Sequence, residues 1–392
     1  PSTTGTNAIQ LRDPLWYAAK YGAPDPANWD TSPPGTPGAG DPDNYFLVTN
    51  PLNLRNQLAK AFDDIASRGL DAGSRTIVGA RIGADSFTLQ PTFQRDRNGK
   101  DWTGNLTAIA LRADGSLGSS LWNARANLPA PTSRNIQTIT SVRDGTSTAA
   151  TGVMKAEFQA ASLGTTNADQ LGKLGITAAR LANGDYGSGS YTADDFVAYL
   201  RGDQSRELGR GAGGTLRARS SVIGSIVNSE PVVAAPRSDL GYGNVFRLNS
   251  DSMFAGYASN TDGTGYLDIK RRRPAVAYVG ANDGMLHAFN AATTPCQLDA
   301  TQTCAGPNAG REAFGFIPNA VLNKLGNIPV VDARYEHQYF VDGQISIGDV
   351  KSGAGTTGAA WKTVLVGSSG GGARSIFALD VSSFSTDPAS AE

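Results

Sequence analysis

The sequence predicts a mainly β protein, a radial array of small antiparallel sheets with a few short helices and long loops. Two similar hairpins support this prediction. Val276–Val279 and Met285–Phe289 flank a glycine-containing turn, and its Asp283–Gly284 pair predicts a type I′ turn with positive φ at both residues. Thr363–Val366 and Ser375–Asp380 repeat the order of strand, glycine turn and strand.

Composition agrees with a loop-rich β protein. The 392 residues include 47 glycines and 20 prolines, while charged residues make up only 18%. The net charge of −1 provides no global field for nucleic acid, and no run of 18 apolar residues predicts a membrane-spanning helix. Because the chain starts at Pro1 without a signal peptide, we expect it to be an internal or processed piece of a longer protein.

Residues 1–75 are predicted to be an irregular segment that contains a docking helix and follows a missing N-terminal domain. Asn50 caps this helix, Pro51 opens it and Gly69 ends it. Its apolar face consists of Leu54, Leu58, Phe62 and Ile65. A shorter helix is expected over Arg12–Lys20.

Residues 76–220 are predicted to be β strands interrupted by an insertion of loops and helix. The expected strands are Thr76–Ile82, Ser86–Gln90, Trp102–Leu111 and Ser120–Asn123. The Ser-, Thr- and Gly-rich region Ala130–Gly187 is interpreted as loops with a short helix near Asp169–Lys173. A second helix is predicted over Thr192–Gly202, with Thr192 and Asp195 in capping-box spacing.

Residues 221–392 are predicted to be propeller blades, truncated at the C-terminus. About four strands are expected in Ser225–Pro318, and Gln338–Val381 repeats the first three. The chain stops where a fourth is expected, which would leave an exposed sheet edge. The strands expected outside the two hairpins are Ser225–Val227, Val232–Ala235, Asn244–Leu248, Ala313–Ile317, Tyr339–Val341 and Ile345–Val350, with a short turn at Leu322–Leu325.

Two of these runs resemble a known family. Gly224–Val232 (GSIVNSEPV) and Tyr278–Phe289 (YVGANDGMLHAF) are similar to the C-terminal propeller of the PilC/PilY family, type IV pilus biogenesis factors and tip-associated adhesins of Gram-negative bacteria. The resemblance extends over nearly the whole chain. Further runs fall in the family's order, namely Asp13–Gly22, Asp101–Leu106, Arg201–Asp203, Glu312–Pro318, His337–Gly343, Trp361–Gly367 and Phe377–Asp380.

The resemblance implies a modified β-propeller similar to quinoprotein dehydrogenases, preceded in the family by a von Willebrand A-like domain that is absent here. It implies a non-enzymatic factor for pilus biogenesis and adhesion, regulated by calcium and located at the cell surface, pilus tip, outer membrane or periplasm. The implied partners are minor pilins of the pilus tip complex and a host or abiotic surface. The alternatives are a periplasmic or outer-membrane scaffold for protein–protein interaction and a quinone-dependent dehydrogenase.

A calcium loop is one candidate site. Oxygen ligands occupy loop positions 1, 3, 5, 7 and 9 at Asn260, Asp262, Thr264, Tyr266 and Asp268. Gly265 stands at position 6, where the sharp turn of such loops needs glycine. Position 12 is Arg271 instead of glutamate, and the family's best-known calcium loop lies beyond Glu392. The alternative is a polar loop whose side chains hydrogen-bond their own backbone.

Two further motifs have both a functional and a structural interpretation. Cys296 and Cys304, eight positions apart in a polar loop, are predicted to form a disulfide in an oxidising compartment, the alternative being two free thiols. Arg201, Gly202 and Asp203 form an RGD tripeptide, the kind that integrins bind, but Gly202 also fits the C-cap of the preceding helix.

The remaining candidates favour a protein that is not an enzyme. His287 and His337 have no ligand spacing and are predicted to hydrogen-bond within or between sheets. We find no P-loop, no G-x-S-x-G, no H-E-x-x-H, and neither the adjacent cysteines nor the acid cluster of a quinone site, so no quinone is expected. Lys270–Arg273 is interpreted as a solvated loop face, the alternative being a basic patch for nucleic acid or lipid.

Overall fold

The computed structural model describes residues 14, 16–18, 76–78, 87–95, 100–112, 114–143, 150–211, 213–236, 238–240, 242, 254–258, 262–291, 309–352 and 358–382. The chain divides into two compact units, Pro1–Leu70 and Asp71–Glu392. In the first unit Pro14 and residues 16–18 are helical, in agreement with the short helix predicted over Arg12–Lys20. The docking helix predicted between Asn50 and Gly69 lies outside the described residues.

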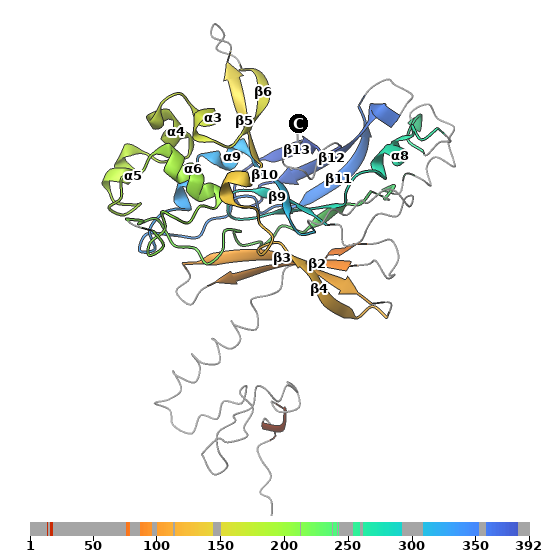
Figure 1. Cartoon of the computed structure of the whole chain (residues 1–392), viewed down its shortest axis with the longest axis horizontal. Coiled ribbons are helices and arrows are strands. Elements are labelled where there is room, and N and C mark those ends of the chain that lie inside the picture. Colours follow the sequence, from red (N-terminus) through yellow and green to blue (C-terminus); the bar gives the residue numbers. More distant parts are fainter. Residues whose placement is uncertain are drawn as a thin grey trace, which may run out of the picture. The chain divides into compact units, whose positions relative to one another are not determined.

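The first sheet of the second unit is an antiparallel meander, drawn in orange on the lower side of that unit in Figure 1. Its four strands, β1 (Thr76–Val78), β2 (Phe87–Arg95), β3 (Trp102–Leu111) and β4 (Leu117–Asn123), pair in sequence order. A turn at Asp114–Gly115 joins β3 to β4. There the Asp114 carboxylate accepts the Ser116 amide at 2.9 Å, and Gly115 adopts a φ of 83°.

The second sheet has six strands in the order β6-β5-β10-β9-β8-β7. Four of them are the expected blade, namely β7 (Val232–Ala234), β8 (Val276–Gly280), β9 (Leu286–Asn290) and β10 (Glu312–Ile317), and they pair antiparallel. The other two strands, β5 (Ile136–Arg143) and β6 (Ala150–Glu157), form a hairpin that projects upward in Figure 1.

The hairpin of β5 and β6 lies in the region predicted to be loops, so that prediction is wrong. β5 pairs in parallel with β10, with Ile136 opposite Gly315 and Thr138 opposite Ile317. Ile136 and Thr138 are buried, and the Thr138 hydroxyl donates to the Ile317 carbonyl at 3.0 Å. A threonine-rich strand is recognisable only when its partner is known, because β propensity depends on the neighbouring strand.

The third sheet repeats the first three blade strands. It consists of β11 (Ile345–Lys351), β12 (Trp361–Ser368) and β13 (Ile376–Asp380), all antiparallel, and β11 contacts β7 and β8 of the second sheet. The order of four strands followed by three is therefore confirmed. The strands expected at Ser225–Val227 and Tyr339–Val341 do not form, and both segments are loops. Their backbone groups hydrogen-bond to Asn282 in the β8–β9 turn instead of to a neighbouring strand. The strand expected at Asn244–Leu248 lies outside the described residues.

Helices cover part of the second sheet. Helix α6 (Ala193–Arg201) has the predicted capping box between Thr192 and Asp195, and Gly202 ends it in a left-handed conformation with a φ of 110°. Helix α4 (Asn167–Lys173) confirms the helix near Asp169–Lys173. The other helices are α3 (Ala160–Leu163), α5 (Ala178–Ala182), α8 (Tyr266–Lys270) and α9 (Asn319–Leu322), with 3₁₀ turns at Pro131–Ser133, Leu325–Asn327 and Gly358–Ala360. None of the helices in the described part of the chain has the length and hydrophobicity that a bilayer crossing requires.

The turn between β8 and β9 differs from the predicted type I′ turn. It has five residues, from Ala281 to Met285, and of these only Gly284 has positive φ, at 97°. The Ala281 amide donates to the Met285 carbonyl at 2.9 Å and closes the turn. The longer turn directs the Asp283 carboxylate inward, where it accepts the amides of Gly224 and Met285.

The β8–β9 hairpin lies at the centre of the second unit, since all ten of its strand residues are buried. Val279 and Phe289 pack with Leu106 and Trp122 of the first sheet. Tyr278 and Leu286 belong to a larger core cluster, which continues through helices α3, α4, α6 and α9 and the third sheet. The first of the two predicted hairpins is therefore the central element, and the first sheet, the third sheet and the helices pack around it.

Two glycines allow the first sheet to approach the second closely. Gly104 on β3 donates its amide to the Ile223 carbonyl at 3.0 Å, and its neighbour Thr103 bridges to Gly224. A Cβ atom on Gly104 would lie 2.0 Å from the Gly224 carbonyl oxygen. Only glycine fits at this crossing.

Candidate functional site

The runs that resemble the PilC/PilY family converge on the β8–β9 turn. Asn282 donates its backbone amide to the Ser225 carbonyl at 3.0 Å, and its side-chain amide to the Ser225 hydroxyl at 3.2 Å and to Asp342 at 3.3 Å. Its side-chain oxygen accepts the Phe340 amide at 3.0 Å. One buried asparagine thus connects the segment before β7 with the segment before β11.

Asp342 extends this polar junction. Its carboxylate accepts the Asn228 backbone amide at 3.1 Å and the Asn228 side-chain amide at 2.5 Å. Nearby, the Gly280 amide donates to the Ser229 hydroxyl at 2.9 Å. Polar residues of three separate runs therefore satisfy one another, and the two blade sheets are joined through hydrogen bonds as well as apolar contacts.

Four buried charged residues, Arg134, Asp283, His287 and Glu312, form what we call the His287 cluster. Glu312 accepts two hydrogen bonds from Arg134, from Nε at 2.6 Å and from Nη2 at 2.8 Å. His287 lies 2.7 Å from Glu312 through Nδ1 and 3.0 Å from Asp283 through Nε2. Opposite charges alternate along the cluster, so its net charge is zero when His287 is protonated, which limits the cost of burial.

The cluster perturbs the pKa values of its members. Burial alone lowers the pKa of His287, but the charges and hydrogen bonds of Asp283 and Glu312 outweigh it and raise the pKa to about 9. Burial alone raises the pKa of Glu312, but Arg134 and His287 reverse this effect and lower the pKa to about 2. His287 is therefore an imidazolium at neutral pH.

The geometry of the His287 cluster favours a structural role. His287 is held between two carboxylates and is fully buried, so a substrate has no access to its ring. Arg134 also donates from Nη1 to the carbonyl of Arg201 at 2.7 Å, which connects the cluster to the end of α6. The prediction that His287 hydrogen-bonds between strands is confirmed, since Glu312 lies on the neighbouring strand β10. Arg134 and Glu312 were missed, because neither stands in a recognisable motif.

His337 differs from its prediction. Its ring stacks on Trp102 with centroids 4.2 Å apart, while both ring nitrogens are buried without a hydrogen-bond partner in the described part of the chain. Burial, with a smaller contribution from the charge of Arg217, lowers the pKa of His337 to about 4. His337 is thus a neutral aromatic packing residue.

Part of the predicted calcium loop is described. Asp262 accepts the Thr264 amide at 3.0 Å and the Thr264 hydroxyl at 2.7 Å, and these bonds lower the pKa of its carboxyl. Tyr266 begins α8 and donates its buried hydroxyl to Asp349 at 3.1 Å, while Asp268 lies 3.7 Å from Arg271. Asn260 is outside the described residues, and among those described no group of three acidic, cysteine or histidine side chains could hold a metal. Calcium binding by this loop stays a prediction.

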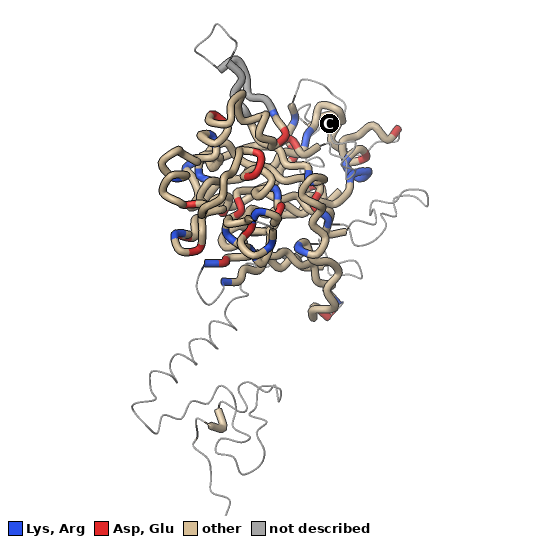
Figure 2. The backbone as a smooth tube through the Cα atoms, turned by 60° about the vertical axis from the view of Figure 1, so that its left-hand side comes forward, with Lys and Arg blue, Asp and Glu red and all other residues tan. Residues whose placement is uncertain are grey.

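The basic run Lys270–Arg273 is not uniformly solvated, so the prediction is wrong for Lys270. The Lys270 ammonium is buried and donates to Asp349 at 2.7 Å. Burial lowers its pKa, and the hydrogen bond and charge of Asp349 oppose that effect. Arg273 lies over the ring of Tyr266 and donates to Thr363 at 3.0 Å. More widely, Figure 2 shows acidic and basic residues interspersed along the described backbone.

The RGD tripeptide is anchored to the helix end. The Arg201 guanidinium is buried and donates to the carbonyls of Phe158 at 2.9 Å and Arg134 at 2.5 Å. Gly202 is the helix C-cap, as predicted, and Asp203 accepts the amide of Ser205. Integrin binding through this tripeptide stays a prediction. The predicted disulfide between Cys296 and Cys304 lies outside the described residues.

Comparison with known proteins identifies relatives of the chain. Residues 223–392 match the family model described as the PilY1 β-propeller domain. The chain is 36% identical over 399 residues to a type IV pilus biogenesis factor PilY1 homologue of Xylella fastidiosa, covering 98% of this chain and 24% of that protein. It is 32% identical over 361 residues to the type IV pilus biogenesis factor PilY1 of Pseudomonas aeruginosa strain PAK, covering 88% of this chain and 26% of that protein.

No solved structure matches significantly. The chain spans about a quarter of the length of the curated relatives that it matches. The family match begins at Ile223, next to the residues that the β8–β9 turn engages, and it includes the blade strands β7–β13. Residues 223–392 of this chain therefore belong to the PilY1 β-propeller family, and over most of its length the chain is similar to proteins named type IV pilus biogenesis factor PilY1.

Proposed function

We propose that the chain acts in type IV pilus biogenesis and adhesion as a non-enzymatic β scaffold. The single observation that supports this best is the β8–β9 hairpin, because its family-like sequence is buried on both faces and joined to both blade sheets. A rigid framework of this kind would hold blade loops in fixed positions as a binding surface. The charged groups of the hairpin satisfy one another, which suits a framework better than a catalytic centre.

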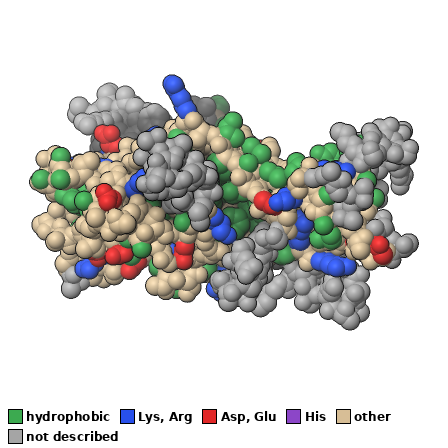
Figure 3. All heavy atoms as spheres, turned by 90° about the horizontal axis from the view of Figure 1, so that it is seen from above, with side chains coloured by type: hydrophobic (Ala, Val, Ile, Leu, Met, Phe, Trp, Pro, Cys, Tyr) green, Lys and Arg blue, Asp and Glu red, His purple; other side chains and the backbone are tan. Residues whose placement is uncertain are grey.

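The proposed partners are minor pilins of the pilus tip complex and a host or abiotic surface, and the proposed location is the pilus tip or cell surface. The names of the relatives support a role with pili in general terms. Calcium, and no quinone, is the cofactor included in this proposal. On the face seen from above in Figure 3, hydrophobic side chains alternate with polar and charged ones, as expected for a surface that contacts water and partners.

The test replaces the native gene in its host with genes encoding Ala288→Asp and, as a matched control, Ala378→Asp. Ala288 is buried in β9, whereas Ala378 occupies the corresponding place in β13 and is exposed. We expect Ala288→Asp to abolish sheared surface pili and twitching motility, and Ala378→Asp to retain both. Normal piliation in a strain lacking the gene would contradict the proposal. Detection of the protein only in the envelope, and never in the sheared pili, would favour a scaffold that does not reach the surface.

A further inference from the structure

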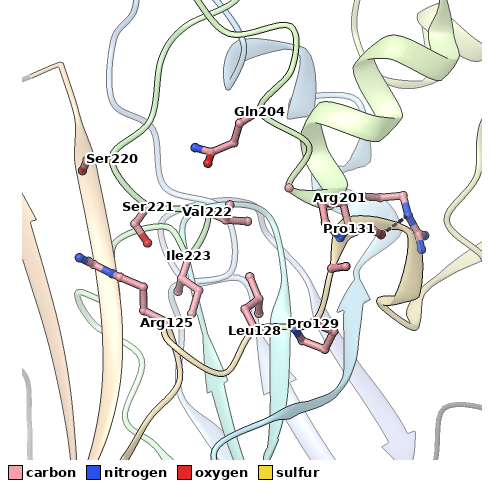
Figure 4. Close-up of a pocket in the computed structure, with 12 residues that line it drawn as sticks. Arg125, Leu128, Pro129, Pro131, Arg201, Gln204, Ser220, Ser221, Val222 and Ile223 are labelled. Carbon is pink, nitrogen blue, oxygen red and sulfur yellow. Dashed lines mark hydrogen bonds between the residues drawn. The ribbon is translucent and has the colours of Figure 1, made fainter. Parts of the chain in front are cut away.

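A cavity of about 340 Å³ lies where the segment after β4, the end of α6 and the segment before β7 come together (Figure 4). Its size is at the lower end of the range for small-ligand sites, which is about 300–1,000 Å³. Leu128, Val222 and Ile223 supply apolar surface, while Arg125, Ser221 and other polar residues line the rest. The cavity is separate from the buried His287 cluster.

Arg125 brings an uncompensated positive charge to this cavity. Its Nη2 donates to the Thr103 hydroxyl at 3.3 Å and to the Gly104 carbonyl at 2.9 Å, but its Nε is buried and has no hydrogen-bond partner among the residues that the structure describes. Within the described residues no carboxylate lies within ion-pairing distance of it. Burial lowers the pKa of the guanidinium, and the charge of Asp101 opposes that effect. Because arginine does not release its proton in proteins, only an anion can compensate this charge.

Ser221 is a second polar group without a partner at the same end of the cavity. The side chain is buried, with 7% of the residue exposed, and its hydroxyl makes no hydrogen bond within the described part of the chain. Figure 4 shows Ser221 above the stem of Arg125 and Ser220 higher still. Most buried polar groups are hydrogen-bonded, and these two, which have no partner among the described residues, belong to residues that line the same cavity.

The opposite end of the cavity needs no ligand. Arg201 donates to the Pro131 carbonyl at 3.3 Å, as the dashed line in Figure 4 marks. Gln204 donates to the Arg219 carbonyl at 3.0 Å and accepts from Arg210 at 3.0 Å. These side chains form walls, with the apolar residues between them and Arg125. The cavity thus has an arginine at each end and apolar residues along its middle, and the Arg201 end is already hydrogen-bonded to the protein.

We propose that this cavity binds a carboxylate attached to a short apolar group, with the carboxylate at Arg125 and Ser221 and the apolar group against Leu128, Val222 and Ile223. A guanidinium recognises a carboxylate through charge-assisted hydrogen bonds, and a hydroxyl from a neighbouring serine adds a donor. The same chemistry is found in a free small acid and in the C-terminal residue of a protein. The inference goes beyond the pilus function, since it assigns a ligand class to a specific cavity.

The test titrates the whole chain with N-acetyl-leucine and with its neutral amide, N-acetyl-leucinamide, by calorimetry. A second pair of probes is a tetrapeptide ending in leucine with a free or an amidated C-terminus. We expect the acids to bind and the amides to bind at least about tenfold more weakly, because a lost charge-assisted contact is of the order of one decade in affinity. Binding of the small acid alone identifies a free metabolite-like ligand, whereas tighter binding of the free-ended peptide identifies a protein C-terminus.

Three variants locate the site. Arg125→Gln removes the charge, Ser221→Ala removes the hydroxyl, and Arg112→Gln makes the same change at an exposed arginine in the turn after β3. We expect Arg125→Gln and Ser221→Ala to weaken binding of the acid, by about tenfold for Arg125→Gln, and Arg112→Gln to leave it unchanged.

The outcomes that overturn the proposal are equally specific. They are no binding of either acid by the wild type, equal binding of acids and amides, or equal effects of Arg125→Gln and Arg112→Gln. Circular dichroism and thermal unfolding show whether each variant folds. If Arg125→Gln does not fold, the wild-type comparison of acid with amide and the Ser221→Ala variant decide the question.

Discussion

The two blade hairpins share one sequence plan but differ in their surroundings. In the β8–β9 hairpin every strand residue is buried, because the first sheet covers one face and the helices and third sheet cover the other. In the β12–β13 hairpin buried and exposed residues alternate, and Val366 and Ile376 are exposed by 41% and 77%. The same local pattern therefore produces a doubly covered sheet in one place and a sheet with one open face in the other.

This difference shows that two hairpins with the same sequence pattern need not contribute equally to the free energy of unfolding. Ala288 and Ala378 occupy corresponding places, yet only Ala288 is fully buried. The ion pairs differ in the same way, since Glu312 and Arg134 are buried beside β9, whereas Lys362 and Asp380 on the second hairpin are about half exposed. Four experiments test or refine this contrast, and a fifth tests the loop that precedes β8.

The largest effect is expected from a charge introduced into each hairpin. Ala288→Asp should lower the free energy of unfolding by about 5 kcal/mol or prevent folding, because a buried carboxylate would have no partner. Ala378→Asp should change it by less than about 1 kcal/mol, since the new carboxylate remains in water. Urea unfolding followed by circular dichroism measures both. Similar losses in the two variants would show that both hairpins are equally covered.

The next effect concerns the buried and the exposed ion pair. Glu312→Gln should cost about 3–5 kcal/mol, because it leaves Arg134 without a compensating carboxylate and leaves His287 with Asp283 alone. Asp380→Asn, which removes the exposed partner of Lys362, should cost roughly 0–1 kcal/mol. The same urea assay applies. A cost below 1 kcal/mol for Glu312→Gln would contradict the account of the His287 cluster.

A third experiment uses pH, because only the first hairpin contains a histidine. The folded pKa of His287, about 9, is above its unfolded value of 6.5, so its stabilising contribution is complete below pH 6.5 and is lost as the pH rises through 9. Between pH 7 and pH 10 the wild type should lose on the order of 3 kcal/mol relative to His287→Gln. Parallel pH profiles of the two proteins would refute the raised pKa.

The low-pH counterpart involves Glu312, whose folded pKa of about 2 is below its unfolded value of 4.5. Its contribution is present above pH 4.5 and is lost as the pH falls through 2. Unfolding curves at pH 5 and pH 2.5 for the wild type and Glu312→Gln should therefore converge toward the acid end.

The smallest effect is expected on calcium binding by the loop that precedes β8. If this loop binds calcium, Asp262→Ala should weaken binding by about tenfold or more, because it removes a carboxylate ligand at position 3. Asp114→Ala is the matched control, since Asp114 makes a similar turn with Ser116 but stands in no calcium-like pattern. Calorimetric calcium titration measures both variants. A wild type that does not bind calcium, or equal affinities of the two variants, would remove the calcium hypothesis.

The local parts of the fold could be predicted from the sequence, whereas the distant ones could not. Residues near one another in the chain determine the cap of α6 at Thr192 and Gly202 and the strand Trp102–Leu111, and these agree with the structure. β5 was missed because its partner β10 is far along the chain and no period distinguishes it from a polar loop. The prediction of a type I′ turn was wrong because the Asp283 carboxylate turns toward Gly224 and His287. A rule based on the Asp-Gly dipeptide alone takes no account of these distant partners.

The candidate sites follow the same division. The sequence identified His287 but gave no sign of Arg134 or Glu312, because their pairing depends on three elements meeting in space. Lys270 was predicted to be solvated like the three arginines that follow it. This prediction was wrong because its buried partner Asp349 is 79 positions away in the chain. The cavity lined by Arg125 could not be predicted, because three segments that share no motif form it.

The parallel pairing of β5 with β10 has a consequence for the order of folding. The Thr138 hydroxyl and the Ile317 carbonyl are separated by 179 positions, so β5 leaves the ribosome long before its partner exists. At ~5–20 residues per second, roughly 10–35 s of synthesis separates the two. During this interval the threonine-rich strand has an unpaired edge that could associate with another chain.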